Sequence, residues 1–226
     1  MTQRRTDGRR TAAATRRRER EAQILAATRA LFDERGVRDA QIEDIASAVG
    51  TNRAIIYRHF SGKEELFALT LVGYLDELHE RLQKVAAAET APRDQLVAIV
   101  SEFADFGLEF PAFVDCAQTL MRRPGPELLD EISESALFRL GRAISGCLRT
   151  ITDTLDAGVA DGTFDIDDTN LLANHMYASG LGALQLARVG MLIKEAAPGI
   201  PTIAPLSPEQ VKRYLVASAT ALAARD

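Results

Sequence analysis

Apolar residues recur every three or four positions along most of the 226-residue chain, which is the spacing of amphipathic helices. The longest stretches with this pattern lack the strict alternation of a β-strand, and they are rich in helix-favouring alanine and leucine. We therefore predict an all-α fold. The predicted helices cover residues 18–35, 41–49, 53–60, 62–85, 92–121 with a break at Pro111, 127–160, 168–195 and 208–222. Residues 196–207, which hold three prolines, are predicted to form a loop.

Residues 36–66 combine the signals of two short helices joined by a tight turn. The first helix has a predicted buried face made of Ile42, Ile45, Ala46 and Val49. Gly50 supplies the turn, and Asn52 is a favourable N-cap for the second helix. This arrangement is typical of a helix-turn-helix, in which the second helix presents a row of side chains to DNA.

The run from Val49 to Leu66 resembles the signature of the tetracycline repressor (TetR) family of bacterial transcription regulators. Its core, Tyr-x-His-Phe-x-x-Lys-Glu-x-Leu, is matched in full from Tyr57 to Leu66. The resemblance implies that Tyr57, His59 and Lys63 bind phosphates of double-stranded operator DNA, and that the first turn after Asn52 enters the major groove. The predicted DNA-binding residues are Arg38, Gln41, Thr51, Asn52, Arg53, Ala54, Ile55, Tyr57, Arg58, His59 and Lys63.

The motif departs from the family pattern at two positions. Ala40 and Gln41 stand where a threonine usually begins the first helix, which leaves Asp39 as the expected cap. Ala54 replaces a frequent glycine of the recognition helix. Two capping boxes are predicted elsewhere, one formed by Ser61 and Glu64, and one formed by Ser207 and Gln210.

Charge is distributed unevenly along the chain. Residues 1–63 carry 14 Lys or Arg against 8 Asp or Glu, a charge of +6, and the overall charge of −5 leaves −11 for residues 64–226. A basic front and an acidic back are expected of a DNA reader with a separate regulatory body. We predict a disordered arginine-rich arm at 1–17, a DNA-binding domain at 18–78 with its motif at 41–60, and a helical effector-binding and dimerisation domain at 79–226. The arm is either a solvated tail or a segment that reaches the minor groove or the phosphates.

Four of the nine phenylalanines fall within residues 103–113, which suits either an apolar ligand pocket or a plain hydrophobic core. Members of the TetR family bind small effectors in this region, so the resemblance implies an effector site, and its aromatic character favours a small apolar or aromatic effector. His175 is either an interior histidine with satisfied hydrogen bonds or a polar group of that pocket. The predicted effector-binding residues are Phe103, Phe106, Phe110, Phe113, Met121, His175 and Tyr177.

The stretch 178–183 is unusually rich in small residues for a helix interior, where each glycine costs roughly 1 kcal/mol relative to alanine. Close approach by another helix would offset this cost, and the last two helices resemble the four-helix dimer interface of the family. We therefore expect a homodimer. The predicted interface residues are Ala178, Gly182, Leu186, Val211, Tyr214, Leu215 and Ser218.

Several classes of protein are disfavoured. The three histidines are far apart, and the chain has neither a metal-ligand spacing nor a hydrolase or phosphate-loop motif, so we expect no catalytic site, metal or cofactor. The N-terminus lacks the apolar segment of a signal peptide, and no stretch suits a membrane span. Cys116 and Cys147 are too few for a disulfide framework and indicate a reducing, cytoplasmic location; each is either a buried structural residue or a thiol sensor.

Three hypotheses follow for the function. The first is a homodimeric repressor that a small apolar effector releases from a pseudo-palindromic operator. The second is a DNA-binding regulator whose C-terminal part only dimerises or binds a protein. The third is a helical enzyme or carrier with a vestigial DNA-binding head, which the retained Tyr57, His59 and Lys63 disfavour.

Overall fold

The computed structural model describes residues 2–122 and 124–224, and this part of the chain contains ten helices and one two-stranded sheet. The helices are α1 (Thr2–Arg35), α2 (Ile42–Ala48), α3 (Arg53–His59), α4 (Lys63–Ala88), α5 (Pro92–Glu109), α6 (Pro111–Met121), α7 (Gly125–Glu131), α8 (Glu134–Ala160), α9 (Thr169–Val189) and α10 (Pro208–Ala223). The strands are β1 (Met191–Ala197) and β2 (Ile200–Pro205). The predicted helical fold is confirmed, and the hairpin is an addition to it.

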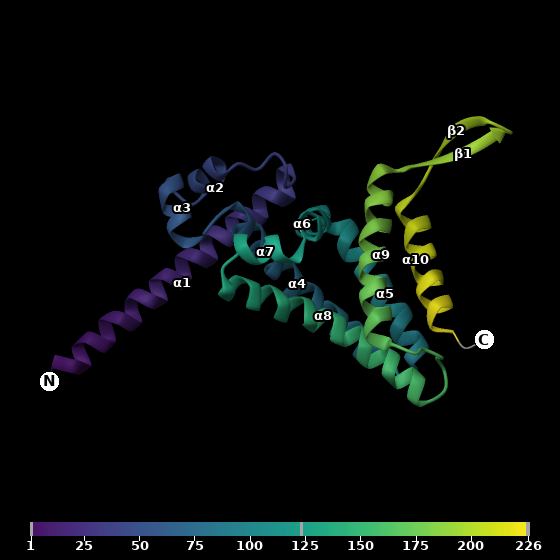
Figure 1. The fold of residues 1–226 in the computed structure, drawn as a ribbon, viewed down its shortest axis with the longest axis horizontal. Helices are drawn as coiled ribbons and strands as arrows, with labels where there is room; N and C mark the ends of the chain where they lie inside the picture. The colour runs from purple at the N-terminus through teal and green to yellow at the C-terminus, as the bar shows by residue number, and fades with distance from the viewer. Residues whose placement is uncertain (1, 123, 225–226) are drawn as a thin grey trace.

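The N-terminal head consists of the second half of α1 with α2 and α3 packed across it (Figure 1). Its core is built from residues of all three helices and of the turn that follows α3: Ile24, Phe32, Ile42, Ile45, Ala46, Ile56 and Phe60. Gly36 and Gly50 have φ values of 82° and 63°, which β-carbon-bearing residues rarely adopt, and they allow the chain to turn sharply after α1 and after α2. The predicted helix-turn-helix arrangement therefore forms.

Helix α4 connects the head to the rest of the molecule. It contacts α1, α5, α6 and α8, and it is buried along most of its length, including Leu66, Leu71, Leu75 and Leu78. Burying a leucine of this kind contributes roughly 1.5–3 kcal/mol, so the packing of α4 is a major source of stability for both parts of the chain.

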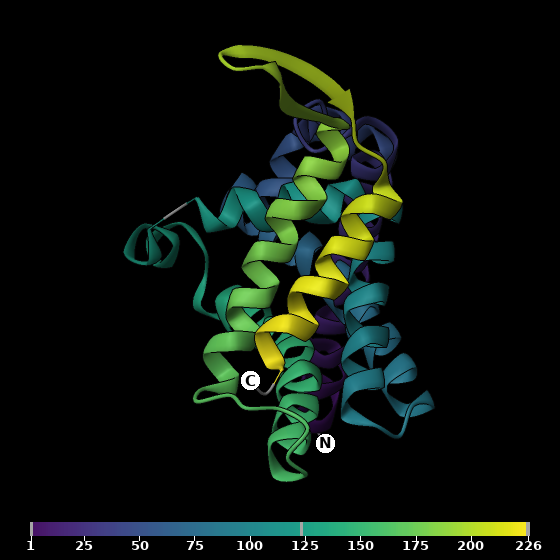
Figure 2. The same ribbon diagram turned by 90° about the vertical axis from the view of Figure 1, so that its right-hand side faces the viewer.

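The body is formed by α5 to α10 around the C-terminal two-thirds of α4. Helices α9 and α10 lie side by side on its outer surface, with α5 and α8 behind them (Figure 2). The hairpin projects from the end of this pair, far from α3 (Figure 1). Within the described residues, no helix is both long enough and apolar enough to cross a membrane.

Residues 190–205 do not form the predicted end of a helix and a loop. Gly190, with a φ of 68°, ends α9 earlier than expected, and β1 pairs with β2 in antiparallel register. The segment contains Ile193, Ile200 and Ile203, whose branched β-carbons favour extended backbone. Two of the three prolines, Pro201 and Pro205, lie within β2, so they do not prevent a hairpin here.

The single helix predicted at 127–160 is two helices. Ile132 is extended and buried between them, and the Ser133 hydroxyl caps α8 by accepting a hydrogen bond from the Ala136 amide at 3.3 Å. A serine placed before an apolar stretch is a helix start signal, so this break was readable from the sequence.

The arginine-rich segment also differs from the prediction, because α1 extends back to Thr2 instead of beginning near residue 18. Arginine and alanine are good helix formers, and lengthening an existing helix avoids the cost of nucleation. The rest of the predicted arm, Met1, lies outside the described residues. Whether this segment contacts DNA remains a prediction.

Two glycines of α8 provide a test of this packing. A β-carbon added to Gly158 would lie 2.0 Å from Cδ2 of the buried Phe164 ring, whereas one added to Gly141 has nothing within 4 Å. We expect Gly158→Ala to destabilise the protein by about 1–3 kcal/mol through overpacking. The matched change Gly141→Ala should stabilise it by about 0.5–1 kcal/mol, because alanine loses less entropy on folding. Urea unfolding at fixed protein concentration measures both, and equal effects would contradict the described packing of Phe164.

Candidate DNA-binding site and effector cavity

Helix α3 is held against the head by its inner residue Ile56, which is buried. The Asn52 side chain accepts a hydrogen bond from the Ile55 amide at 3.2 Å, so the predicted N-cap is confirmed. Arg53, Ala54, Tyr57 and Arg58 are exposed, and Thr51 and Ile55 are half-buried. The outer face of α3 and its first turn are therefore open to a partner.

Arg53 is oriented by two neighbours on this surface. Its Nη1 atom lies 3.1 Å from Oε1 of Glu43 in α2, and its guanidinium lies 5.3 Å from the centre of the Tyr57 ring. Both members of the ion pair are more than half exposed, so the pair contributes little to stability. The guanidinium can therefore exchange Glu43 for a base or a phosphate at small cost.

His59 and Lys63 lie at the other end of α3. Burial, with a smaller effect of Arg17, lowers the pKa of His59, which is therefore neutral at pH 7. Its buried Nδ1 has no hydrogen-bond partner among the described residues. A neutral imidazole binds a phosphate through an N–H group and not through charge. The ammonium group of Lys63 lies 5.1 Å from the centre of the Phe67 ring.

The two predicted DNA contacts that precede α2 occupy different surroundings. Gln41 is exposed and is the N-cap of α2, where its backbone amide donates to Oδ2 of Asp44 at 3.2 Å. Asp39, the expected cap, does not have this role. Arg38 is exposed and lines a polar cleft of about 300 Å³ with Asp115, Gln185 and Arg188. Arg38 thus lies at the junction between head and body.

Glu65 connects the start of α4 to α8. The residue is 6% exposed, and its carboxylate accepts the Ser61 amide at 2.5 Å and the Ser133 hydroxyl. The capping box predicted for Ser61 and Glu64 is replaced by this contact, because Gly62 is the N-cap and the Ser61 amide bonds Glu65. Burial raises the pKa of Glu65, but the hydrogen bonds from Ser133 and Ser61 outweigh it and lower the pKa overall. In the sequence, the signal for this role is the position of Glu65 directly before the apolar residues of α4.

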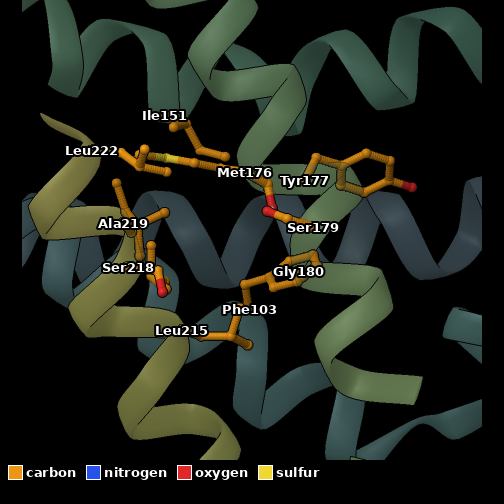
Figure 3. Close-up of a pocket in the computed structure, with 12 residues that line it drawn as sticks. Phe103, Ile151, Met176, Tyr177, Ser179, Gly180, Leu215, Ser218, Ala219 and Leu222 are labelled. Atoms are coloured by element: carbon orange, nitrogen blue, oxygen red, sulfur yellow. The ribbon is translucent and has the colours of Figure 1, made fainter. Parts of the chain in front are cut away.

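An apolar cavity of about 50 Å³ lies between α5, α8, α9 and α10. Figure 3 shows α10 on one side of it and α9 on the other, with the Tyr177 hydroxyl directed away from α10. The hydroxyl of Ser179 bonds back to the carbonyl of His175 at 2.8 Å, which leaves the lining with little polar character. The lining residues are Ile99, Val100, Phe103, Ile151, Met176, Tyr177, Ser179, Gly180, Leu215, Ser218, Ala219 and Leu222.

Of the seven predicted effector-binding residues, only Phe103 and Tyr177 line this cavity. Phe106 and Phe113 are fully buried with ring centres 5.3 Å apart, and Phe110 packs on Phe106. These three rings belong to the core between α4, α5 and α6, so for them the core interpretation is the one that the structure favours. Met121 is 55% exposed and His175 is exposed, so neither lines the cavity.

The predicted dimer residues fall into two groups. Ala178, Gly182 and Leu186 are exposed on one face of α9, and Tyr214 of α10 is 71% exposed. Val211 is buried within its own chain and Leu215 is half-buried at the cavity, so these two differ from the expectation of an outer face. Ser218 lines the cavity but is exposed. In the small-residue stretch, a β-carbon on Gly180 would lie 2.6 Å from Cε1 of Phe103, whereas Gly182 faces open space. Close contact within the chain therefore explains why residue 180 is a glycine, but it does not explain the glycine at 182.

A helix-turn-helix with an open second helix, carried on a separate helical body, defines a DNA-binding regulator. Residues 24–70 match the family model described as "Bacterial regulatory proteins, tetR family". Residues 24–70 therefore form a DNA-binding domain of the TetR family, and the chain is a DNA-binding transcriptional regulator of the TetR type. The resemblance seen in the motif is confirmed.

Similar proteins extend the match beyond the head. The chain is 34% identical over 88 residues to the transcriptional activator FasR of Mycolicibacterium smegmatis, covering 39% of this chain but only 40% of FasR. It is 25% identical over 186 residues to the transcriptional repressor KstR2 of Mycobacterium tuberculosis, covering 76% of this chain and 87% of KstR2. The structure of RolR in complex with the ligand resorcinol superposes with a TM-score of 0.67 at 17% identity, covering 93% of this chain and 90% of RolR.

The two cysteines yield a prediction that separates a structural role from a thiol sensor. Both are buried; burial raises the pKa of Cys147 to about 12 and raises that of Cys116 as well. Because the thiolate is the reactive species, native protein at pH 8 should react negligibly with Ellman's reagent over minutes. After unfolding in guanidinium, both thiols should react at once. Rapid reaction of one thiol in the native protein would indicate a sensor.

Proposed function

We propose that the protein is a homodimeric repressor that a small apolar or aromatic effector releases from a pseudo-palindromic operator. The observation that carries this proposal is the apolar cavity enclosed by α5, α8, α9 and α10, which lies at a distance from the open face of α3. Two recognition helices are required because a single short helix reads too few bases for genomic specificity. We further propose residues 18–78 as the DNA-binding domain and 79–226 as the effector-binding and dimerisation domain.

Two similar proteins support the effector class. KstR2, which matches most of its length, is a repressor, and the ligand of RolR is resorcinol, a single aromatic ring. The cavity of about 50 Å³ is far smaller than the roughly 300–1,000 Å³ of drug-sized sites. An effector must therefore be small and must also widen the cavity by moving its walls.

The contacts of α8 provide a route from the cavity to the head. Ile151 of α8 lines the cavity, and Ser133, at the start of the same helix, bonds Glu65 at the start of α4. Glu65 in turn accepts the amide of Ser61, which lies two residues beyond the end of α3. A shift of α8 would thus move the end of α3 and Lys63. Coupling of this kind is reciprocal, so DNA should weaken effector binding by the same factor, typically 5- to 150-fold for roughly 1–3 kcal/mol.

In the head, we propose that Arg53 reads bases, while Tyr57, His59 and Lys63 bind phosphates and set the position of the protein on the duplex. A guanidinium at the start of a recognition helix can bond O6 and N7 of one guanine together. Glu43 and Tyr57 already hold Arg53 at this place. Ile55, which is half-buried at the same end, suits contact with a thymine methyl group.

This assignment predicts different defects for two variants. Arg53→Ala should relax base preference at one or two positions of the half-site, with a loss of about 1–3 kcal/mol on the preferred sequence. Lys63→Ala should weaken binding to all sequences alike and lower the salt slope by roughly one. Selection of binding sites from random DNA, followed by titrations at several salt concentrations, measures both. An unchanged selection profile for Arg53→Ala would contradict the assignment.

The cavity predicts a variant that separates effector response from DNA binding. Ala219→Leu fills the cavity, and it should leave operator affinity within about threefold while raising the effector concentration for half-release at least tenfold, which corresponds to about 1.4 kcal/mol. Ala157→Leu, at an exposed position of α8, is the matched control and should respond like the natural protein.

The assay is a mobility shift on the DNA upstream of the coding region, with single-ring aromatic and other small apolar compounds as candidate effectors. Thermal unfolding of both variants checks that Ala219→Leu is folded. If no apolar compound releases the natural protein from its operator, the body only dimerises or binds a protein, and the second hypothesis stands.

A further inference from the structure

The hairpin has an apolar face and a more polar face, as fixed by its register. Ile193 pairs with Ile203, Met191 with Pro205, and Glu195 with Pro201, so the side chains of these pairs lie on one face. The other face holds the pairs of Leu192 with Ala204 and of Lys194 with Thr202. Five of the six side chains on the first face are apolar. We call this first face, which consists of Met191, Ile193, Glu195, Pro201, Ile203 and Pro205, the hairpin face.

The hairpin face is turned towards solvent. Ile193 is 84% exposed, Ile203 68% and Met191 50%, whereas Leu192 and Ala204 on the opposite face are half-buried. Among the residues that the structure describes, β1 and β2 pair with no third strand, and two-stranded hairpins are marginally stable in water. Such an arrangement exposes its apolar side chains at a cost unless another surface covers them.

The backbone of β2 disfavours strand addition as the way in which a partner covers the hairpin face. The Leu206 amide donates to the Gly190 carbonyl at 2.9 Å, so residues 190 and 206 form a hydrogen-bonded pair. In an antiparallel ladder, hydrogen-bonded pairs alternate with pairs whose amides point away from the partner strand. The residues of the hairpin face belong to the second kind of pair, so their amides point outward. Pro201 and Pro205 have no amide hydrogen, so the outer edge of β2 lacks two of its donors. A partner must therefore pack on the hairpin face and not extend the sheet at β2.

The apolar surface continues from the hairpin onto α9. Gly182, Leu186 and Val189 are exposed along one side of α9 and lead to Met191 and Ile193. No other element lies in front of α9 and α10 in Figure 2, and the hairpin extends beyond the helices of its own chain. The hairpin face is thus the outer part of the surface that the proposed dimer uses.

We propose that the hairpin is a dimerisation arm whose apolar face packs on α9 and α10 of a second copy of this chain. This inference rests on the proposed homodimer. In a two-fold assembly each arm would reach the other subunit, which gives two equivalent contacts. The only charge on the hairpin face is the carboxylate of Glu195, which opposes binding to DNA or to an anionic membrane.

The arm would enlarge the surface that the two helices offer. Stable interfaces bury about 800 Å² on each partner. Helix α9 has 21 residues, and the shorter α10 places Val211 and Ala219 inside the chain. Burial of Met191, Ile193 and Ile203 would add apolar area to this interface.

The test compares two neighbouring residues on opposite faces of β2. Ile203→Asp places a charge on the hairpin face, and Thr202→Asp places the same charge on the other face. We expect Ile203→Asp to raise the dimer dissociation constant at least tenfold, and Thr202→Asp to change it less than threefold. Sedimentation equilibrium over a range of protein concentrations measures the constants. Far-ultraviolet circular dichroism checks that both variants are folded.

The remaining outcomes separate this inference from the proposed function. If Ile203→Asp and the double variant Ile193→Asp/Ile203→Asp keep the natural dissociation constant while Gly182→Arg yields monomers, the arm is refuted and the dimer stands. A natural protein that is monomeric at all concentrations refutes both. A membrane contact would have a different signature. The natural protein would float with phosphatidylglycerol vesicles and Ile203→Asp would not, while both would dimerise equally well. This result refutes the arm.

Discussion

The burial of α4 is the constraint on which both parts of the molecule depend. It packs against α1 on one side and against α5, α6 and α8 on others, so one helix belongs to the core of the head and to the core of the body. A helix of 26 residues with apolar side chains on several faces cannot remain in water, and it is stable only when elements surround it. Head and body are therefore mechanically connected through a rigid element and not through a loop.

Polar contacts then determine how the head sits on this helix. The Tyr74 hydroxyl donates to Oδ1 of Asp33 in α1 at 2.6 Å, and burial together with this carboxylate raises the pKa of Tyr74. The Arg29 guanidinium lies 4.3 Å from the centre of the Tyr74 ring and bonds Glu77 at 2.5 Å. Because these groups are partly withdrawn from water, alternative arrangements would leave polar atoms unpaired, and the head has few orientations of similar energy. Glu65 adds the corresponding contact to α8.

The parts of the fold that sequence reasoning anticipated depend on local signals. Asn52, Gly50 and the Ser207–Gln210 pair act within one helix turn, and each has its predicted role, with the Ser207 hydroxyl accepting the Gln210 amide at 3.2 Å. The effector cavity was harder to place because it depends on which helices become neighbours. Four phenylalanines within eleven residues indicate an apolar region, but the rotation of α5 directs Phe106 into the core and Phe103 towards α9. The contribution of α10 to the cavity depends on contacts more than 100 residues apart, and no local pattern contains them.

The same tertiary contacts determine which wall of the cavity can move. On α9, a β-carbon at Gly180 would already collide with Phe103, so α9 and α5 have no spare room between them. Helix α10 buries Val211, Ala219 and Ala223 and packs on both α5 and α9, while its ion pair between Lys212 and Asp105 is partly exposed. In the proposed mechanism, a ligand that enlarges the cavity therefore moves α10 together with α8, and not α9. Because the outer face of α10 lies beside that of α9, such a displacement also alters the surface offered to a second copy, so effector binding and subunit geometry cannot be independent in the proposed dimer.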